Sequence, residues 1–209
     1  DDYELGWKFA NHKNQINING FYMLYHDQLV LTGALDNVGN VIRTNVGKSY
    51  RVGLEVDALI NFAKKWSIRP NLTLSENKNI DFVNNNGTHF ENLGNTNIAF
   101  SPKIVAGNIL NFKAIKNWDI SLLSKYVGKQ FLSNFEDENA VLKNYFVQDF
   151  LLKYSIEPKK YIKNITFSFL GNNIFNTKYV SNGADYGGGY VYYFPQAGSN
   201  FMLGMDLKF

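Results

Sequence analysis

The chain contains no cysteine and only four prolines, and it has no run of about 18 apolar residues. Without cysteine there is no disulfide framework, no thiolate zinc site and no cysteine nucleophile. The missing apolar run excludes a membrane-spanning helix. It does not exclude membrane strands, because these alternate apolar and polar residues and leave an unremarkable mean hydropathy, which is −0.25 here.

Charge is sparse and nearly balanced. Charged residues make up 19% of the chain and aromatic residues 16%, a composition too rich in aromatic rings for a disordered segment. The formal net charge is +3, and the basic residues do not form the single cluster that binds nucleic acid. We therefore expect ordered structure in one large domain or two small ones, with no nucleic-acid partner.

Apolar and polar residues alternate along most of the chain. From Tyr50 to Ile60 nearly every second residue is apolar, and Arg51, Glu55 and Asp57 lie between them. A strand places these three charged side chains on one face, whereas a helix spreads them around its axis. The pattern predicts an all-β chain of about nine strands, at residues 3–10, 14–27, 43–61, 66–79, 98–112, 118–130, 142–156, 162–175 and 198–209.

Short and long connections alternate between these predicted strands. An up-and-down antiparallel meander with unlike ends produces such alternation, as in outer-membrane barrels with short periplasmic turns and long extracellular loops. The short connections are residues 10–13, 62–65, 113–117 and 157–161, and the long ones are residues 28–42, 80–97, 131–141 and 176–197.

Aromatic and basic residues gather near the short connections. In a meander the aromatic rings form one girdle at one rim, as expected at a membrane interface; they are Trp7, Phe9, Phe62, Trp66, Phe112, Trp118, Tyr154, Tyr161 and Phe209. The lysines are either solvated turn residues or contacts to lipid headgroups; they are Lys13, Lys64, Lys65, Lys113, Lys116, Lys159 and Lys160.

A soluble β-barrel with its apolar face inside shows the same alternation. The polar face here, however, carries mid-strand charges that a small filled interior does not accommodate, among them Arg51, Glu55, Asp57, Arg69 and Lys125. These charges are typical of a wet lumen, so the sequence predicts an antiparallel up-and-down transmembrane β-barrel. Because bacterial single-chain barrels have even strand numbers, the chain is either the last part of a larger barrel or a miscounted barrel of eight or ten strands that closes alone.

Several segments resemble the C-terminal barrel of TonB-dependent outer-membrane receptors. They follow the order of that family, cover almost the whole chain and include NNIFNTKY and a terminal phenylalanine as the most specific elements; they are SYRVGLEVDALINFAKKWSIRPNLTLSENK, SPKIVAGNILNF, KYVGKQFLSN, LKNYFVQDFLLKYSI, FLGNNIFNTKYVSNG and PQAGSNFMLGMDLKF. The resemblance implies a 22-stranded barrel around an N-terminal plug. Residues 1–209 are then its C-terminal part, and the plug and roughly the first half of the barrel lie outside this chain.

The resemblance also implies a function in the outer membrane without a cofactor and without enzymatic chemistry. TonB would act through the plug to import a scarce, bulky nutrient, in the first place a ferric siderophore, with haem, a vitamin or an oligosaccharide as alternatives. A second hypothesis is a structural barrel whose loops bind partner proteins, such as a surface lipoprotein. By resemblance, Phe209 closes the barrel and is the signal for the barrel-assembly machinery.

Candidate contact residues lie in one long connection and on the polar face. Exposed tyrosines at a loop tip either bind planar or glycan ligands or extend an outer aromatic rim; they are Tyr186, Tyr190, Tyr192 and Tyr193. Charged residues of the polar face either meet a ligand in the lumen or contact the plug; they are Arg51, Glu55, Asp57 and Arg69.

Other candidates favour structural interpretations. His12, His26 and His89 are far apart and expected in turns or loops, so no metal site is predicted. The acidic residues 136–138 are expected to form a solvated loop tip rather than a calcium site. The turn at residues 173–176 is expected to support the barrel rather than to bind ligand, because asparagine satisfies backbone groups where a chain leaves a sheet.

Overall fold

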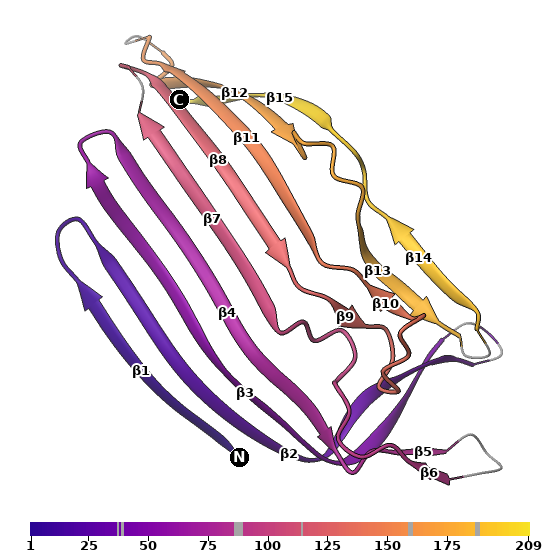
Figure 1. Cartoon of the computed structure of the whole chain (residues 1–209). Coiled ribbons are helices and arrows are strands. Elements are labelled where there is room, and N and C mark those ends of the chain that lie inside the picture. Colours follow the sequence, from indigo (N-terminus) through magenta and orange to yellow (C-terminus); the bar gives the residue numbers. More distant parts are fainter. Residues whose placement is uncertain (37, 39, 86–89, 114, 159–160, 187–188) are drawn as a thin grey trace.

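A computed structural model describes residues 1–36, 38, 40–85, 90–113, 115–158, 161–186 and 189–209. It contains one nine-stranded antiparallel sheet, in which each strand pairs with the next sheet strand along the chain (Figure 1). The predicted all-β meander is therefore confirmed. The strands of the sheet are β1 (Asp2–Ala10), β2 (Gln15–Leu35), β3 (Val41–Ala63), β4 (Trp66–Ile80), β7 (Ile104–Lys113), β8 (Trp118–Val127), β11 (Tyr145–Ile156), β12 (Asn164–Asn172) and β15 (Asn200–Lys208).

Three short hairpins stand outside the sheet in the described part of the chain. Each lies within a long connection at one end of the sheet, which we call the loop end (Figure 1). The short connections and the C-terminus lie at the opposite, short-turn end. The hairpins are β5 (Val83–Asn85) with β6 (Phe90–Asn92), β9 (Gln130–Phe131) with β10 (Val141–Leu142), and β13 (Val180–Asp185) with β14 (Val191–Pro195).

The connection predicted at residues 28–42 is wrong, because β2 and β3 continue through most of it. Their ladder still pairs Gln28 with Val46 and Leu31 with Arg43. Asp27 within β2 has a φ of 53°, and the ladder keeps its register on both sides of it. Beyond it the hairpin curves across the loop end and reaches β13 (Figure 1).

The sheet is curved like a barrel wall but does not close on itself. β1 and β15 form its two edges, and both are exposed along their whole length. Each edge presents backbone N–H and C=O groups without a ladder partner. The alternative of a barrel of eight or ten strands that closes alone is therefore wrong.

The pairing register sorts the side chains onto two faces. Leu54 of β3 is opposite Leu74 of β4, whereas the next residue, Glu55, is opposite Thr73. On the polar face Asn17 Nδ2 donates to Asp57 Oδ2 over 2.8 Å, across the β2–β3 pair. The alternation read from the sequence thus corresponds to one apolar and one hydrogen-bonding face.

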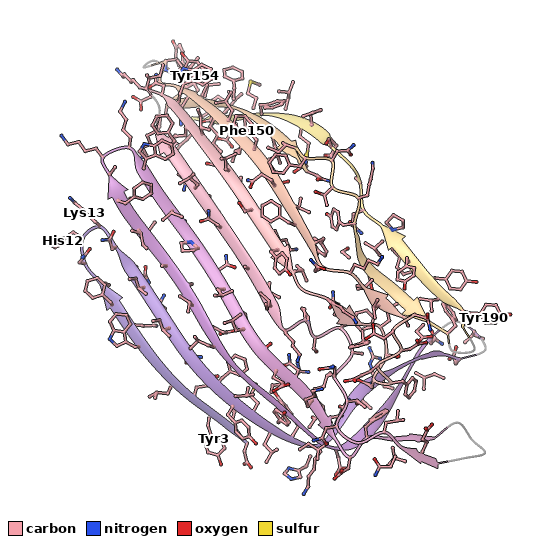
Figure 2. All side chains as sticks on the ribbon, viewed as in Figure 1. Tyr3, His12, Lys13, Phe150, Tyr154 and Tyr190 are labelled. Atoms are coloured by element: carbon pink, nitrogen blue, oxygen red, sulfur yellow. The ribbon has the colours of Figure 1, made fainter. Side chains whose placement is uncertain are left out.

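Aromatic rings mark the short-turn end of the apolar face. The ring centroids of Trp66 and Phe112 are 4.2 Å apart, and those of Trp118 and Tyr154 are 4.6 Å apart. Figure 2 shows Tyr154 at this end of the sheet. These pairs confirm the predicted girdle for the strands that carry them.

A second group of rings, which the sequence did not predict, lies toward the loop end of the apolar face. Tyr22 stacks on Tyr3 and on Tyr50, with centroid distances of 6.5 and 6.4 Å. On β8 the apolar face runs from Trp118 to Tyr126, a length of roughly 26 Å along the strand. The two groups of rings therefore bracket a band about as tall as the apolar belt of a membrane barrel.

The assignment of the two faces is testable with single lysines on β4. Leu72→Lys places an amine on the apolar face and is expected to cost roughly 2–4 kcal/mol near the bilayer midplane. Thr73→Lys places the same amine on the polar face and is expected to change stability by less than about 0.5 kcal/mol. Equilibrium unfolding of the full barrel in lipid vesicles measures both, and equal losses would contradict the assignment.

Candidate functional site

The loop end has an apolar cluster of its own. Leu132, Ala140 and Leu142 are almost completely buried. Phe100 and the strand residues Val180 and Val191 pack against them. The cluster joins the segment before β7 to the β9–β10 and β13–β14 hairpins. Because burying a leucine side chain contributes about 1.5–3 kcal/mol, these loops are held together by more than their hydrogen bonds.

A buried asparagine pair ties the same loops to the sheet. Asn79 Nδ2 at the end of β4 donates to Thr96 Oγ1 over 3.1 Å and to Asn134 Oδ1 over 3.3 Å. Asn134 Oδ1 also accepts a 2.9 Å hydrogen bond from the Ala99 backbone N–H. Both asparagines are fully buried. Their hydrogen bonds hold the segment 96–99 and the β9–β10 connection against the loop end of β4.

The acidic residues 136–138 have separate partners. Glu136 lies 3.4 Å from the Lys78 amine and also accepts from the backbone N–H of Asn97. Glu138 accepts a 2.8 Å hydrogen bond from Lys129. Among the described residues there is no group of three His, Cys, Asp or Glu side chains placed to hold a metal ion. Glu136 and Glu138 therefore form ion pairs with two different lysines, Lys78 and Lys129.

A pocket of about 470 Å³ lies between the β9–β10 and β13–β14 hairpins. Tyr193 closes one side, where its hydroxyl donates to the Asn139 carbonyl oxygen over 3.0 Å. The lining combines rings, amines and one carboxylate; it includes Glu138, Asn139, Lys143, Lys178, Tyr179 and Tyr193. Of these, the sequence analysis singled out Tyr193 for ligand contact, and Lys143, Lys178 and Tyr179 were missed.

The four predicted tyrosines do not converge on one point. Tyr193 faces the β9–β10 hairpin, whereas Tyr192 points to the opposite side of β14, as consecutive strand residues do. Tyr186 meets Tyr192 edge-on, with ring centroids 5.0 Å apart. Tyr190 is 69% exposed at the hairpin tip, at the loop end in Figure 2. The structure therefore places three rings on an outward surface and one against the pocket.

The predicted lumen residues lie on the polar face of β3 and β4. Asp57 is held by Asn17, as described above, and Glu55 lies opposite Asn19 on β2. Arg69 is exposed on β4, opposite Ile109 of β7. The face is thus lined by ionisable and amide side chains, with Arg51, Glu55, Asp57 and Arg69 all on it.

Asn173 is the centre of the turn that follows β12. It is 3% exposed and has a φ of 48°. Its backbone N–H donates to Asp149 Oδ1 over 2.7 Å, and its side chain exchanges hydrogen bonds with the N–H and C=O of Thr177. Its Nδ2 also donates to the Ala197 carbonyl, across the whole β13–β14 insertion. These bonds fit the structural role expected for this turn.

The remaining predicted residues lie apart from the loop cluster. Phe209 follows β15 at the short-turn end and is 71% exposed, and its main-chain oxygen accepts a 2.9 Å hydrogen bond from Lys163 Nζ. His12 lies in the β1–β2 turn (Figure 2), but His26 lies inside β2, so its expected loop position is wrong. His89 lies outside the described residues.

Comparison with known families identifies the fold. A sequence model of the family described as TonB dependent receptor-like, beta-barrel, matches residues 1–174. The chain belongs to this family. Its members are outer-membrane β-barrels. No curated protein matches the chain. No helix in the described ranges is long and apolar enough to span a membrane.

Solved structures show the same fold at low sequence identity. The ferric-catecholate import receptor Fiu of E. coli K12 is 19% identical, with a TM-score of 0.70 over 100% of this chain and 27% of its own. The copper transporter OprC is 17% identical, with a TM-score of 0.71 over 99% and 31%. A chain in the structure of the FpvAI–pyocin S2 complex is 13% identical, with a TM-score of 0.64 over 98% and 26%. The chain thus spans less than a third of each.

The asparagine pair gives a test of the loop cluster. Asn134→Ala removes the acceptor of two hydrogen bonds, from the buried Asn79 side chain and from the partly buried Ala99 N–H, at an expected cost of about 1–3 kcal/mol. Amide hydrogen exchange in the segment 96–99 is expected to accelerate accordingly. Asn144→Ala, at an exposed position in the same connection, is the matched control. Unchanged exchange in Asn134→Ala would show that the pair does not hold the loops.

Proposed function

We propose that residues 1–209 are the C-terminal part of a TonB-dependent receptor, and that the whole receptor imports a scarce, bulky nutrient. The proposed whole barrel has 22 strands around a plug, in keeping with the plugged outer-membrane transporters. The family match over residues 1–174 carries the proposal. The open edges of β1 and β15, and the share of less than a third that the chain spans in the compared receptors, support it.

A ferric siderophore is the substrate that we propose first. Fiu is a ferric-catecholate import receptor, whereas OprC is a copper transporter, so the shared fold alone does not select a ligand. The loop end adds exposed tyrosine rings, on which planar aromatic groups stack. The nearby pocket adds the amines of Lys143 and Lys178, which attract anionic oxygens. Haem, a vitamin or an oligosaccharide are the other candidate cargoes.

The polar face is proposed to line the lumen and to contact the plug. Arg51 and Arg69 supply cations, and Glu55 and Asp57 supply carboxylates, on neighbouring strands of the same wall. A polar plug surface meets such a wall through hydrogen bonds and ion pairs without burying an unpaired charge. Phe209 is proposed as the site that the barrel-assembly machinery recognises.

The second candidate function is a barrel whose loops bind partner proteins. It is favoured by the similarity to a chain in the structure of the FpvAI–pyocin S2 complex. The outward surface of Tyr186, Tyr190 and Tyr192 supports this candidate too, because tyrosine is enriched at protein interfaces. A surface lipoprotein is one partner of this kind.

Iron supply and TonB separate the two candidates. A siderophore receptor is expected to become several-fold more abundant under iron limitation, and deletion of tonB is expected to abolish uptake of the labelled ferric siderophore. Quantitative mass spectrometry of outer membranes and a filter-binding uptake assay measure these effects. Absence of uptake even with TonB present, together with an abundance that does not change with iron supply, would contradict the transport proposal and favour the partner-binding barrel.

The tyrosine surface gives a residue-level test. Replacing Tyr186, Tyr190 and Tyr192 with alanine removes three exposed rings and is expected to weaken ligand binding at least tenfold, in line with interface tyrosines. Tyr161→Ala is the control, since it removes an exposed ring from the β11–β12 connection at the short-turn end, away from this surface. Binding to whole cells measures both variants, and an unchanged affinity in the triple variant would exclude this surface as the contact.

A further inference from the structure

Charge is segregated between the two ends of the sheet. At the short-turn end the described basic residues are Lys8, Lys13, Lys64, Lys65, Arg69, Lys113, Lys116, Lys153, Lys163 and Lys208, against the acidic residues Asp119, Glu157 and Asp206. At the loop end acidic residues predominate, and ion pairs such as Lys78–Glu136 and Lys103–Glu76 join them to the fewer basic ones. The small net charge of the whole chain conceals this asymmetry.

The densest part of the short-turn end comes from two turns that touch. The Lys113 backbone N–H donates to the Lys65 carbonyl oxygen over 2.9 Å, which joins the β3–β4 turn to the end of β7. Lys64, Lys65, Lys113 and Lys116 therefore belong to one continuous surface, and each is exposed. We call this surface, together with Lys13 of the β1–β2 turn, the basic rim.

The basic rim directly adjoins the aromatic girdle. Trp66 follows Lys65 and Phe112 precedes Lys113, and the two rings stack at 4.2 Å. Rings of this kind sit at the boundary between hydrocarbon and water. A lysine one residue further out carries its amine past the rings to the level of the headgroup phosphates, with its apolar stem along the interface. In Figure 2 Lys13 lies in the β1–β2 turn, at the same short-turn end of the sheet.

We propose that the basic rim binds the headgroups of acidic phospholipids in the periplasmic leaflet. The proposal is independent of the transported ligand. It rests on charge complementarity and on the continuity of the rim with the membrane girdle. A lysine near an anionic lipid surface contributes on the order of fivefold in affinity, so several lysines on one surface select acidic over zwitterionic lipid. Because the attraction is electrostatic, salt is expected to screen it.

The test measures lipid selectivity of the full receptor in vesicles. The protein is reconstituted in phosphatidylcholine with a trace of spin-labelled phosphatidylglycerol or spin-labelled phosphatidylcholine, and electron spin resonance gives the immobilised fraction of each. The wild type is expected to prefer phosphatidylglycerol several-fold, and 1 M salt is expected to remove the preference. In a variant with Lys64→Gln, Lys65→Gln and Lys116→Gln the preference is expected to fall at least threefold.

A loop-end variant with Lys48→Gln, Lys103→Gln and Lys129→Gln loses the same charge and is expected to keep the preference. Equal losses in both variants would show a general charge effect and overturn the assignment to the rim. No preference in the wild type would overturn the lipid proposal. The heat-dependent gel mobility of the barrel reports folding. If the triple variant does not fold, Lys64→Gln and Lys116→Gln separately are each expected to show a partial loss, and full retention in both would contradict the proposal.

Discussion

Hydrocarbon offers no hydrogen-bond partner to a backbone amide, and the antiparallel pairing from β1 to β15 satisfies this constraint everywhere except along the two outer edges of the sheet. The other features follow from the ladder. Because strand side chains alternate, one face is committed to lipid and the other to water, which places Leu54 and Glu55 next to each other in sequence and on opposite sides of the wall. The girdles of rings mark the levels at which the requirement for apolar residues ends.

The ladder also explains why sequence reasoning succeeded for most of the fold. Alternation is imposed wherever a strand faces lipid, so the membrane parts of the nine strands could be located, although the strand predicted at residues 98–112 begins only at Ile104. Outside the membrane both faces of a strand meet water, and the alternation is lost. For that reason the outer part of the β2–β3 hairpin, from Gln28 to Val41, was mistaken for a loop although its ladder continues.

The candidate site was much less predictable, because its contacts join residues far apart in the chain. Asn79 and Asn134 form a buried pair across 55 positions, and neither differs in sequence from the many exposed asparagines. Composition did predict a tyrosine-rich loop. It could not predict that Tyr192 and Tyr193 face opposite ways, because that depends on which side of the β13–β14 hairpin meets Leu132 and its neighbours. Lys143 and Lys178 carry no sequence pattern that marks a pocket.

The two unpaired edges of the sheet limit how this stretch of barrel can be exchanged between proteins during evolution. A globular domain can be moved between proteins because it folds by itself, whereas the edges of β1 and β15 must each meet another strand before this wall can enter a bilayer. Recombination can exchange such a stretch only when the new segment has the same number of strands and when both of its edge strands pair in register with the neighbouring strands of the other barrel. Sequence differences in the loops are less constrained, because the loops do not have to pair with the neighbouring strands of the barrel.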